Sequence, residues 1–522
     1  MKNVKLTDKT LSNKYLIIIC FAALAIILGI DFLTRHSEWD QAVAYQRAVR
    51  MLNGEIPFKD FFLLYLPLSV YLNSLVLQIN NSFLTIKFIG IIVCLYILFT
   101  TYFIPKQITA STKAGLASAI MTYFFALRVW PESNYSWYSV SAILTMLLIV
   151  LQDYNLITKQ FRFCSKSWLF AGVFLGISFC LKHNFATIIG VAISLFLIFN
   201  TLLTKGNRQK SVIYAFAGLI LGLVAPLLLM IIYLISNHLL TDAYKDIVLG
   251  ASSYVEFMKF SYLNNLVINP TLESQSTLKM IIGLSEMILK IAVVICVPLV
   301  GPCILIYSFL NRNILHRQLL SFLGSICSAS LLFLFPRSDY PHLAFVLPIL
   351  FVGTVVSFSI LQIKSSWKHS ILSCFYICLL LISFIMSFEK IVAIAKGDLK
   401  YVPISASFVE QDIYQDIQLN LNVINQIQAE GKTVVILDPS LSLYYPYLKI
   451  SNPLRYDFPT EGNFGVNKGS DVIEYIKSNS NICIFVSKLA AGEVFFPSKI
   501  VKSIQSISNS SISVGRWNIY CR

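Results

Sequence analysis

The sequence has 522 residues, of which 56% are apolar and only 13% are charged. Soluble domains carry about a quarter charged residues, so this composition excludes an ordinary cytosolic protein and predicts a membrane protein. The formal net charge of +15 would indicate a nucleic-acid partner in a soluble chain. In so apolar a chain, an orientation signal across a membrane explains the charge, and no nucleic acid is expected.

Eleven apolar segments are long enough to cross a bilayer, which takes about 20 residues because the hydrocarbon is about 30 Å thick. The first segment follows four lysines and lacks a small-residue cleavage site, so we expect a retained signal anchor with a cytoplasmic N-terminus. The predicted spans are residues 14–33, 83–104, 114–128, 137–153, 168–183, 185–203, 211–236, 280–309, 318–335, 342–363 and 370–388.

The loops predicted to be cytoplasmic are all basic, as the charge bias of membrane proteins requires. The segment from Leu63 to Ile79 is also apolar, but a span there would place every later basic loop outside. Pro67 and several hydroxyl and amide side chains suit a helix at the water boundary. We therefore predict an interfacial helix, with an ordinary span as the alternative. The basic loop residues are Lys106, Lys113, Lys159, Arg162, Lys166, Lys205, Arg208, Lys210, Arg312, Arg317, Lys364 and Lys368.

A change in composition near residue 389 predicts two domains, a membrane domain over 1–388 and an extracytoplasmic domain over 389–522. The second contains a predicted helix over 412–432 and short apolar strands over 433–437 and 482–486, which indicates a small α/β domain. Cys483 and Cys521 both fall in predicted strands, and a disulfide between them is one alternative on the oxidising side of a membrane.

Ionisable residues gather in four loops on the predicted outer face, where such groups often mark function. Carboxylates there can act as a general base, and Arg or Lys can hold a phosphate. A long outer segment, from His238 to Lys279, is either a further interfacial helix that covers a groove or a plain connection. The loops contain Asp40, Arg47, Asp60; Arg128, Glu132, Asn134, Tyr135; Lys182, His183, Asn184; and Arg337, Asp339, His342.

The stretch from Asp40 to Leu75 resembles the first outer loop of the GT-C superfamily of polytopic glycosyltransferases. It is closest to the branch of aminoarabinose and lipopolysaccharide-core sugar transferases and protein O-mannosyltransferases. In that branch an acid begins an amphipathic helix, Leu-x-Gly closes it, an aromatic-basic-Asp-Phe turn follows, and a Pro-containing interfacial helix comes next. The matching residues are Asp40, Tyr45, Leu52, Gly54, Phe58, Lys59, Asp60, Phe61 and Pro67, with Phe58 where Tyr is commoner and one proline where two are usual.

Looser matches continue along the membrane part. They are Glu132 in the second outer loop, a Gly-x-x-x-Gly helix that ends at Lys182, and an Arg337 loop ahead of a Pro-broken helix. The resemblance implies a helical GT-C-like membrane domain with about eleven spans and interfacial helices in the outer loops, followed by the small α/β domain. It implies a multi-pass protein of the bacterial plasma membrane.

The implied reaction is transfer of a sugar from a polyprenyl-phosphate donor to a glycan, lipid or protein acceptor. Asp40 would be the general base and Glu132 a second acid that positions the acceptor or a metal. Lys182, Arg337 and His342 would hold the donor phosphate, and Asp60, Tyr45, Asn134 and Tyr135 would contact substrate. No cofactor is certain, and a divalent metal stays open because two carboxylates do not define a site.

Each assignment has a structural alternative. Asp40 can be a helix cap, Glu132 a solvated charge, and Lys182 and Arg337 snorkelling cations. For the whole protein, the rivals are a transporter or flippase of lipid-linked sugars and a non-catalytic scaffold. A transporter would place ionisable residues at the bilayer midplane, whereas here they concentrate at one face.

Overall fold

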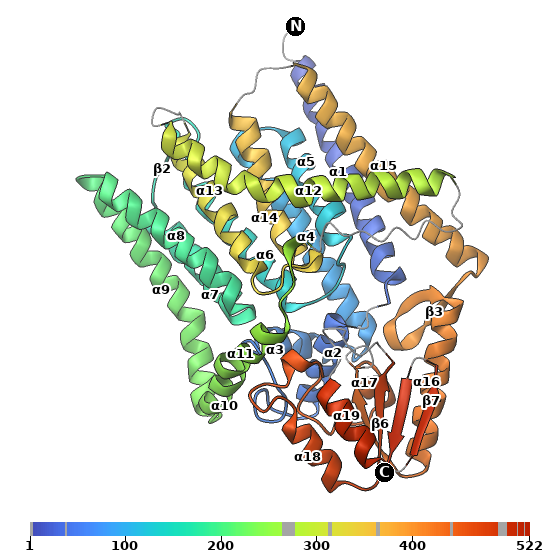
Figure 1. Ribbon diagram of the computed structural model, residues 1–522. Coiled ribbons are helices and arrows are strands. Elements are labelled where there is room, and N and C mark those ends of the chain that lie inside the picture. The colour runs from blue at the N-terminus through green and yellow to red at the C-terminus, as the bar shows by residue number, and fades with distance from the viewer. Residues whose placement is uncertain are drawn as a thin grey trace.

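The computed structural model describes residues 4–36, 39–263, 277–311, 316–361, 366–438, 442–488, 498–508, 510–515 and 517–522. A long helical bundle forms one end of the molecule and a small mixed domain the other, with the two termini at opposite ends (Figure 1). All eleven apolar segments that the sequence predicts as spans are helical. Within the described residues, nine helices are long and apolar enough to cross a membrane.

The helices of the membrane part follow the apolar runs closely. Three predicted spans differ in form. Residues 114–128 divide into α5 and a π-helical turn, η1, residues 168–183 form the 17-residue helix α7, and residues 318–335 divide into α13 and a 3-10 turn, η4. The bounds are α1 Val4–Thr34, α4 Phe83–Thr109, α5 Thr112–Thr122, η1 Tyr123–Leu127, α6 Tyr135–Gln152, α7 Ser165–Leu181, α8 His183–Leu203, α9 Asn207–Ser236, α12 Thr277–Leu310, α13 Arg317–Ser330, η4 Leu331–Leu334, α14 Tyr340–Ile360 and α15 Ser366–Lys396. A short hairpin, β1 Tyr154–Asn155 and β2 Gln160–Phe161, joins α6 to α7.

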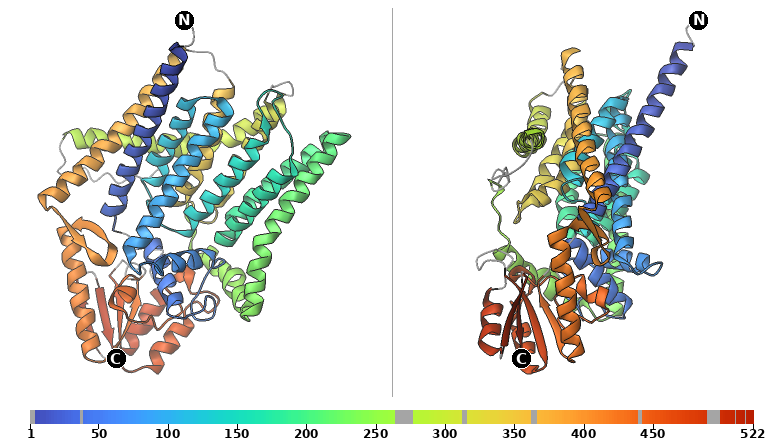
Figure 2. Two further views of the ribbon diagram at one scale, coloured as in Figure 1. Left: turned by 180° about the vertical axis from the view of Figure 1, so that it is seen from behind. Right: turned by 90° about the vertical axis from the view of Figure 1, so that its right-hand side faces the viewer.

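Helix α12 takes a course that its sequence does not reveal. It runs across the bundle, and Figure 2 shows it end-on in the view where its neighbours run lengthwise. Length and hydropathy predict a helix in the membrane but carry no information about its direction.

Short helices occupy the loops that the sequence predicts to be outside. Helix α3, Leu68–Leu77, has ten residues, which is too short to cross the hydrocarbon, so the alternative of an ordinary span over 63–79 is wrong. Helix α2, Asp40–Leu52, precedes it. The segment from His238 to Lys279 is helical in its first part, through α10 Leu240–Tyr244, η2 Lys245–Leu249 and α11 Gly250–Phe257. Residues 264–276 of that segment lie outside the described residues.

The C-terminal domain is built on a four-stranded sheet in the order β5-β6-β8-β7. Strands β5 and β6 are parallel, and β8 pairs antiparallel with β6 and β7. Cys483 and Cys521 face each other across β6 and β8 and form a disulfide, which confirms that alternative. The elements are β3 Leu399–Val402, η5 Pro403–Ser405, β4 Ser407–Glu410, α16 Gln411–Ala429, β5 Thr433–Leu437, α17 Tyr444–Leu448, η7 Glu461–Asn463, α18 Ser470–Ser478, β6 Ile482–Ser487, α19 Ser498–Ile507, β7 Ser510–Val514 and β8 Trp517–Cys521.

Helix α2 joins the two parts of the molecule. Its apolar residues Ala42, Tyr45 and Val49 belong to the same buried core as Ile404 and Tyr445 of the C-terminal domain. Burial of this apolar face fixes the orientation of the helix, because rotation would return those side chains to water. The opposite face, which begins with Asp40, is thereby directed at the ends of the membrane helices that lie nearest the C-terminal domain.

Candidate active site

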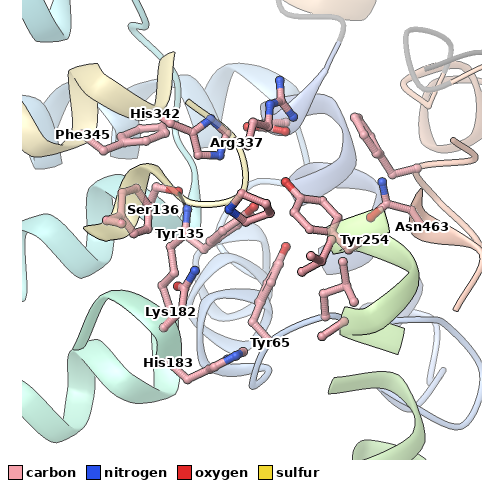
Figure 3. Close-up of a pocket in the computed structure, with 18 of the residues that line it drawn as sticks. Tyr65, Tyr135, Ser136, Lys182, His183, Tyr254, Arg337, His342, Phe345 and Asn463 are labelled. Carbon is pink, nitrogen blue, oxygen red and sulfur yellow. Dashed lines mark hydrogen bonds between the residues drawn. The ribbon is translucent and has the colours of Figure 1, made fainter. Parts of the chain in front are cut away.

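A cavity of about 330 Å³ lies where the membrane helices meet α2, α11 and the C-terminal domain. Figure 3 shows Lys182, Ser136 and His342 on one side of it and Tyr254 and Asn463 on the other. Five residues that the sequence predicts as site residues lie in its walls, although they come from four separate parts of the chain. They are Asp40, Tyr135, Lys182, Arg337 and His342.

Asp40 is the first residue of α2, and its carboxylate lines the cavity. Burial raises the pKa of Asp40, while the positive charges of Arg337 and Lys182 lower it. The raised pKa follows from the loss of water around the carboxylate, which disfavours its charged form. A carboxylate of increased proton affinity is suited to the work of a general base near neutral pH.

Lys182 lies at the break between α7 and α8, which projects its side chain into the cavity. Its Nζ donates a hydrogen bond to Ser136 Oγ at 2.7 Å. Within the described part of the chain, no carboxylate approaches Nζ to ion-pair distance. The ammonium group instead lies 4.4 to 5.3 Å from the centres of three aromatic rings, those of Phe333, Tyr135 and Phe345. A desolvated cation without a paired anion provides a site for an anionic ligand.

Asp339 holds the other two predicted phosphate ligands. Its Oδ2 accepts a hydrogen bond from Arg337 Nε at 2.5 Å, and its Oδ1 lies 2.5 Å from His342 Nδ1. Burial alone would raise the pKa of Asp339, but the hydrogen bond from His342 and the charge of Arg337 hold that pKa well below its usual range. The carboxylate also caps α14 through the backbone N–H of His342. The sequence signal for this role is an Asp three residues before a His at a predicted helix start.

Glu132 lies behind Asp40 and does not line the cavity. It is 2% exposed, and its Oε1 is 3.5 Å from Arg35 Nε. Burial raises the pKa of Glu132 to about 7, against the charge of Arg35 and with help from the negative charge of Asp40. The arrangement couples the protonation of the two acids, since ionisation of one disfavours ionisation of the other.

Three further predicted site residues point elsewhere. Asn134 caps α6, where its Oδ1 accepts hydrogen bonds from the N–H groups of Ser136 and Trp137. Asp60 accepts a hydrogen bond from the backbone N–H of Ile56 within its own turn. Tyr45 lies on the far face of α2, with its hydroxyl 3.3 Å from Asn81 Oδ1.

Residues that the sequence did not single out complete the cavity. Tyr65 stacks on Tyr135 with ring centres 3.9 Å apart, and its hydroxyl accepts a hydrogen bond from Arg47 at 2.7 Å. Tyr254 comes from α11, while Phe458 and Asn463 come from the C-terminal domain. No motif marks these residues, because they reach the site only through the packing of distant segments. Among the described residues, no three His, Cys, Asp or Glu side chains gather as a metal site would require.

The sequence matches no protein-family model and no curated protein. Solved structures do match the fold. ArnT from Cupriavidus metallidurans, in a crystal structure bound to undecaprenyl phosphate, aligns with a TM-score of 0.56 at 10% identity over 96% of this chain and 97% of ArnT. The Archaeoglobus fulgidus oligosaccharyltransferase, in a complex with zinc and sulfate, aligns with a TM-score of 0.50 at 12% identity over 96% of this chain and 73% of its own.

The chain has the GT-C fold. This confirms the resemblance that the Asp40 to Pro67 stretch indicates, and it confirms the predicted helical membrane class. A structural likeness at 10% identity shows the fold alone, so activity has to be argued from the site.

Proposed function

We propose that the protein is a glycosyltransferase that moves a sugar from a polyprenyl-phosphate donor to an acceptor at the outer face of a membrane. The observation that carries the proposal is the joint placement of the Asp40 carboxylate and the Lys182 and Arg337 cations in one cavity at the ends of apolar helices. A lipid-linked phosphate can reach such a cavity from the bilayer. The crystal structure of ArnT, which shares the fold, is bound to a lipid of this class, undecaprenyl phosphate.

In the proposed reaction, Asp40 takes the proton from an acceptor hydroxyl or amine. The acceptor atom forms a bond to the anomeric carbon, and the bond from that carbon to the phosphate oxygen breaks with inversion. The phosphodiester of the donor becomes a phosphate monoester and gains one negative charge. Lys182 and Arg337, with His342 beside them, stabilise that charge as it develops.

Each part of this assignment has a structural basis in the cavity. Lys182 has no ion-pair partner in the described structure, so a phosphate can occupy that place. Arg337 is oriented by Asp339 and lines the cavity, where its positive charge can act on a bound phosphate. The negative charge of Asp339 adds to the raised pKa of Asp40. Glu132 lies outside the cavity lining, and the negative charge of Asp40 raises the pKa of Glu132. The acceptor classes that the resemblance implies are a glycan, a lipid or a protein.

The decisive experiment supplies membranes that contain the protein with radiolabelled polyprenyl-phosphate sugars and compares the parent with Asp40→Asn. We expect transfer to fall by at least about 100-fold, because general base catalysis typically contributes that much or more. Asp242→Asn, at an exposed position on α10, is the matched control and should transfer at the parent rate. Parent activity retained in Asp40→Asn removes that residue as the base. No transfer by the parent with any donor overturns the proposed function.

A further inference from the structure

A second and larger cavity lies on the opposite face of α2. Its volume is about 670 Å³, twice that of the candidate active site. Asp40, Val43 and Arg47 line the first cavity, whereas Gln46 and Val49 line the second, as the helical period requires for residues on opposite faces. The remaining walls are the turn over residues 81–83 and residues 445–452 and 403–404 of the C-terminal domain.

Gln46 is the polar residue of this cavity whose amide is open to a ligand. The residue is 3% exposed and lines the cavity, and no hydrogen bond from its amide to a described residue is seen. An amide offers two donor hydrogens and one acceptor oxygen. A ligand that carries several hydroxyl groups would satisfy both kinds of site.

Arg50 and Glu55, which line the interior of the cavity, neutralise each other, whereas the third charged lining residue, Lys449, is exposed to solvent. Arg50 donates from Nε to Glu55 at 2.7 Å and from Nη1 to Asp457 at 2.9 Å. The same guanidinium also donates to the backbone carbonyls of Leu454 and Asp60. Its hydrogen-bonding capacity is therefore used within the protein, and it is not available to a phosphate. The interior favours an uncharged ligand.

Aromatic rings and amides make up the rest of the lining. Tyr45 and Tyr445 are buried in the floor, while Tyr447 stands at the rim with 41% of its surface exposed. Asn53 and Asn81 are exposed beside it. Sugar rings present apolar C–H faces and polar hydroxyl edges. The Tyr447 ring at the rim suits the apolar face, and the Gln46 amide suits the hydroxyl groups.

We infer that this second cavity is a binding site for a neutral saccharide. The Gln46 amide bonds its hydroxyl groups, and the Tyr447 ring packs on a sugar face. The site is separate from the cavity of Asp40, with α2 as the wall between them. It requires no transfer reaction, so it stands or falls independently of the proposed function.

The test uses the full-length protein in lipid nanodiscs, because sugar-based detergents would compete. Saturation-transfer NMR and calorimetry measure binding of maltotriose, mannotriose and chitotriose, with no donor present. We expect saturable binding of at least one of them, and Gln46→Met and Tyr447→Ala should each weaken it about fivefold or more. Gln426→Met and Tyr401→Ala replace exposed residues outside the cavity and should bind as the parent does.

Other outcomes overturn the inference. Absence of binding for all three saccharides does so, as does binding that both cavity variants leave unchanged, since the sugar would then lie elsewhere. Should Gln46→Met fail to fold, Asn53→Ala at the exposed rim takes its place beside Tyr447→Ala. Asp40→Asn should bind saccharide as the parent does, which separates failure of this site from failure of the transfer reaction.

Discussion

Asp40 lies among charges of both signs, and their balance sets the pH at which it can act as a base. Burial raises its pKa, and Arg337 and Lys182 lower it. A base must be ionised, so we expect transfer to decline as pH falls through this raised pKa. Lys182→Met removes one cation that lowers the pKa, and the acidic limb of kcat/KM should therefore move to higher pH.

The measurement is a pH–rate profile of parent and variant. The position of the limb is the readout, because loss of donor affinity lowers the rate at every pH without moving the limb. Lys182→Arg keeps the charge and should retain a limb close to that of the parent. A limb that stays in place, or moves to lower pH in Lys182→Met, would contradict the electrostatic coupling between Lys182 and Asp40.

The site residues show how far the sequence can be read at this scale. Asp40, Lys182 and Arg337 were predictable because ionisable residues at one membrane face are costly and uncommon. Tyr45 was assigned to the site from the same motif as Asp40. It lies five residues further along α2, which places its side chain on the helix face away from Asp40. Phe458 and Asn463 carry no local signal, since only the docking of the C-terminal domain brings them to the cavity.

The junction between α2 and the C-terminal domain depends on one buried carboxylate. The side chain of Asp457 is 0% exposed, and it pairs with Arg50 at 2.9 Å and with Arg47 at 3.6 Å. Asp457→Ala removes the anion that pairs with Arg47 and one of the two that pair with Arg50, so we expect destabilisation of about 3 kcal/mol or more. Thermal unfolding in nanodiscs checks this. Glu430→Ala, which breaks the exposed pair with Lys432, should leave the transition temperature nearly unchanged.

Helices α7 and α9 approach each other through glycines. A Cβ added at Gly222 would lie 2.0 Å from the backbone oxygen of Leu169, and one at Gly172 would lie 2.1 Å from that of Leu219. Gly222→Ala must therefore separate the helices, which lowers stability and displaces Lys182 at the end of α7.

We expect a lower transition temperature and reduced transfer in Gly222→Ala, measured by thermal unfolding and by the radiolabel assay. Gly29→Ala on α1 provides the control, because nothing lies within 4 Å of the added carbon. Equal behaviour of the two variants would show that the close crossing of α7 and α9 contributes nothing to either property.

At the scale of the molecule, the basic loops predict the orientation of the whole chain. Cys164 is exposed in the loop before α7, which the charge bias places in the cytoplasm. In a variant with the other exposed free cysteines replaced by Ser, a membrane-impermeant maleimide should label Cys164 only after the cells are permeabilised. Ser506→Cys, exposed in the C-terminal domain, should react in intact cells. Labelling of Cys164 from outside would invert the assignment.

The parts of the fold that depend on the residues of a single segment were predictable from the sequence. The parts that depend on packing between distant segments were not. The apolar runs located every membrane helix, and Pro67 with its polar neighbours distinguished α3 from a span. The direction of α12 across the bundle depends on the helices that it packs against, so it could not be predicted from the sequence of α12 itself. The orientation of α2 was not predictable for the same reason, because its Ala42 and Val49 pack in a core formed with the C-terminal domain, which is distant in sequence.

The contact between Arg50 and Asp457 joins residues 407 positions apart, and it has a consequence for biosynthesis. The ribosome completes α2 before it makes the loop that carries Phe458 and Asn463. Until that loop has folded against α2, the wall of the cavity beside Asp40 is incomplete. A partly made chain thus carries Asp40 without the enclosed cavity, and folding of the C-terminal domain determines when the candidate site is complete.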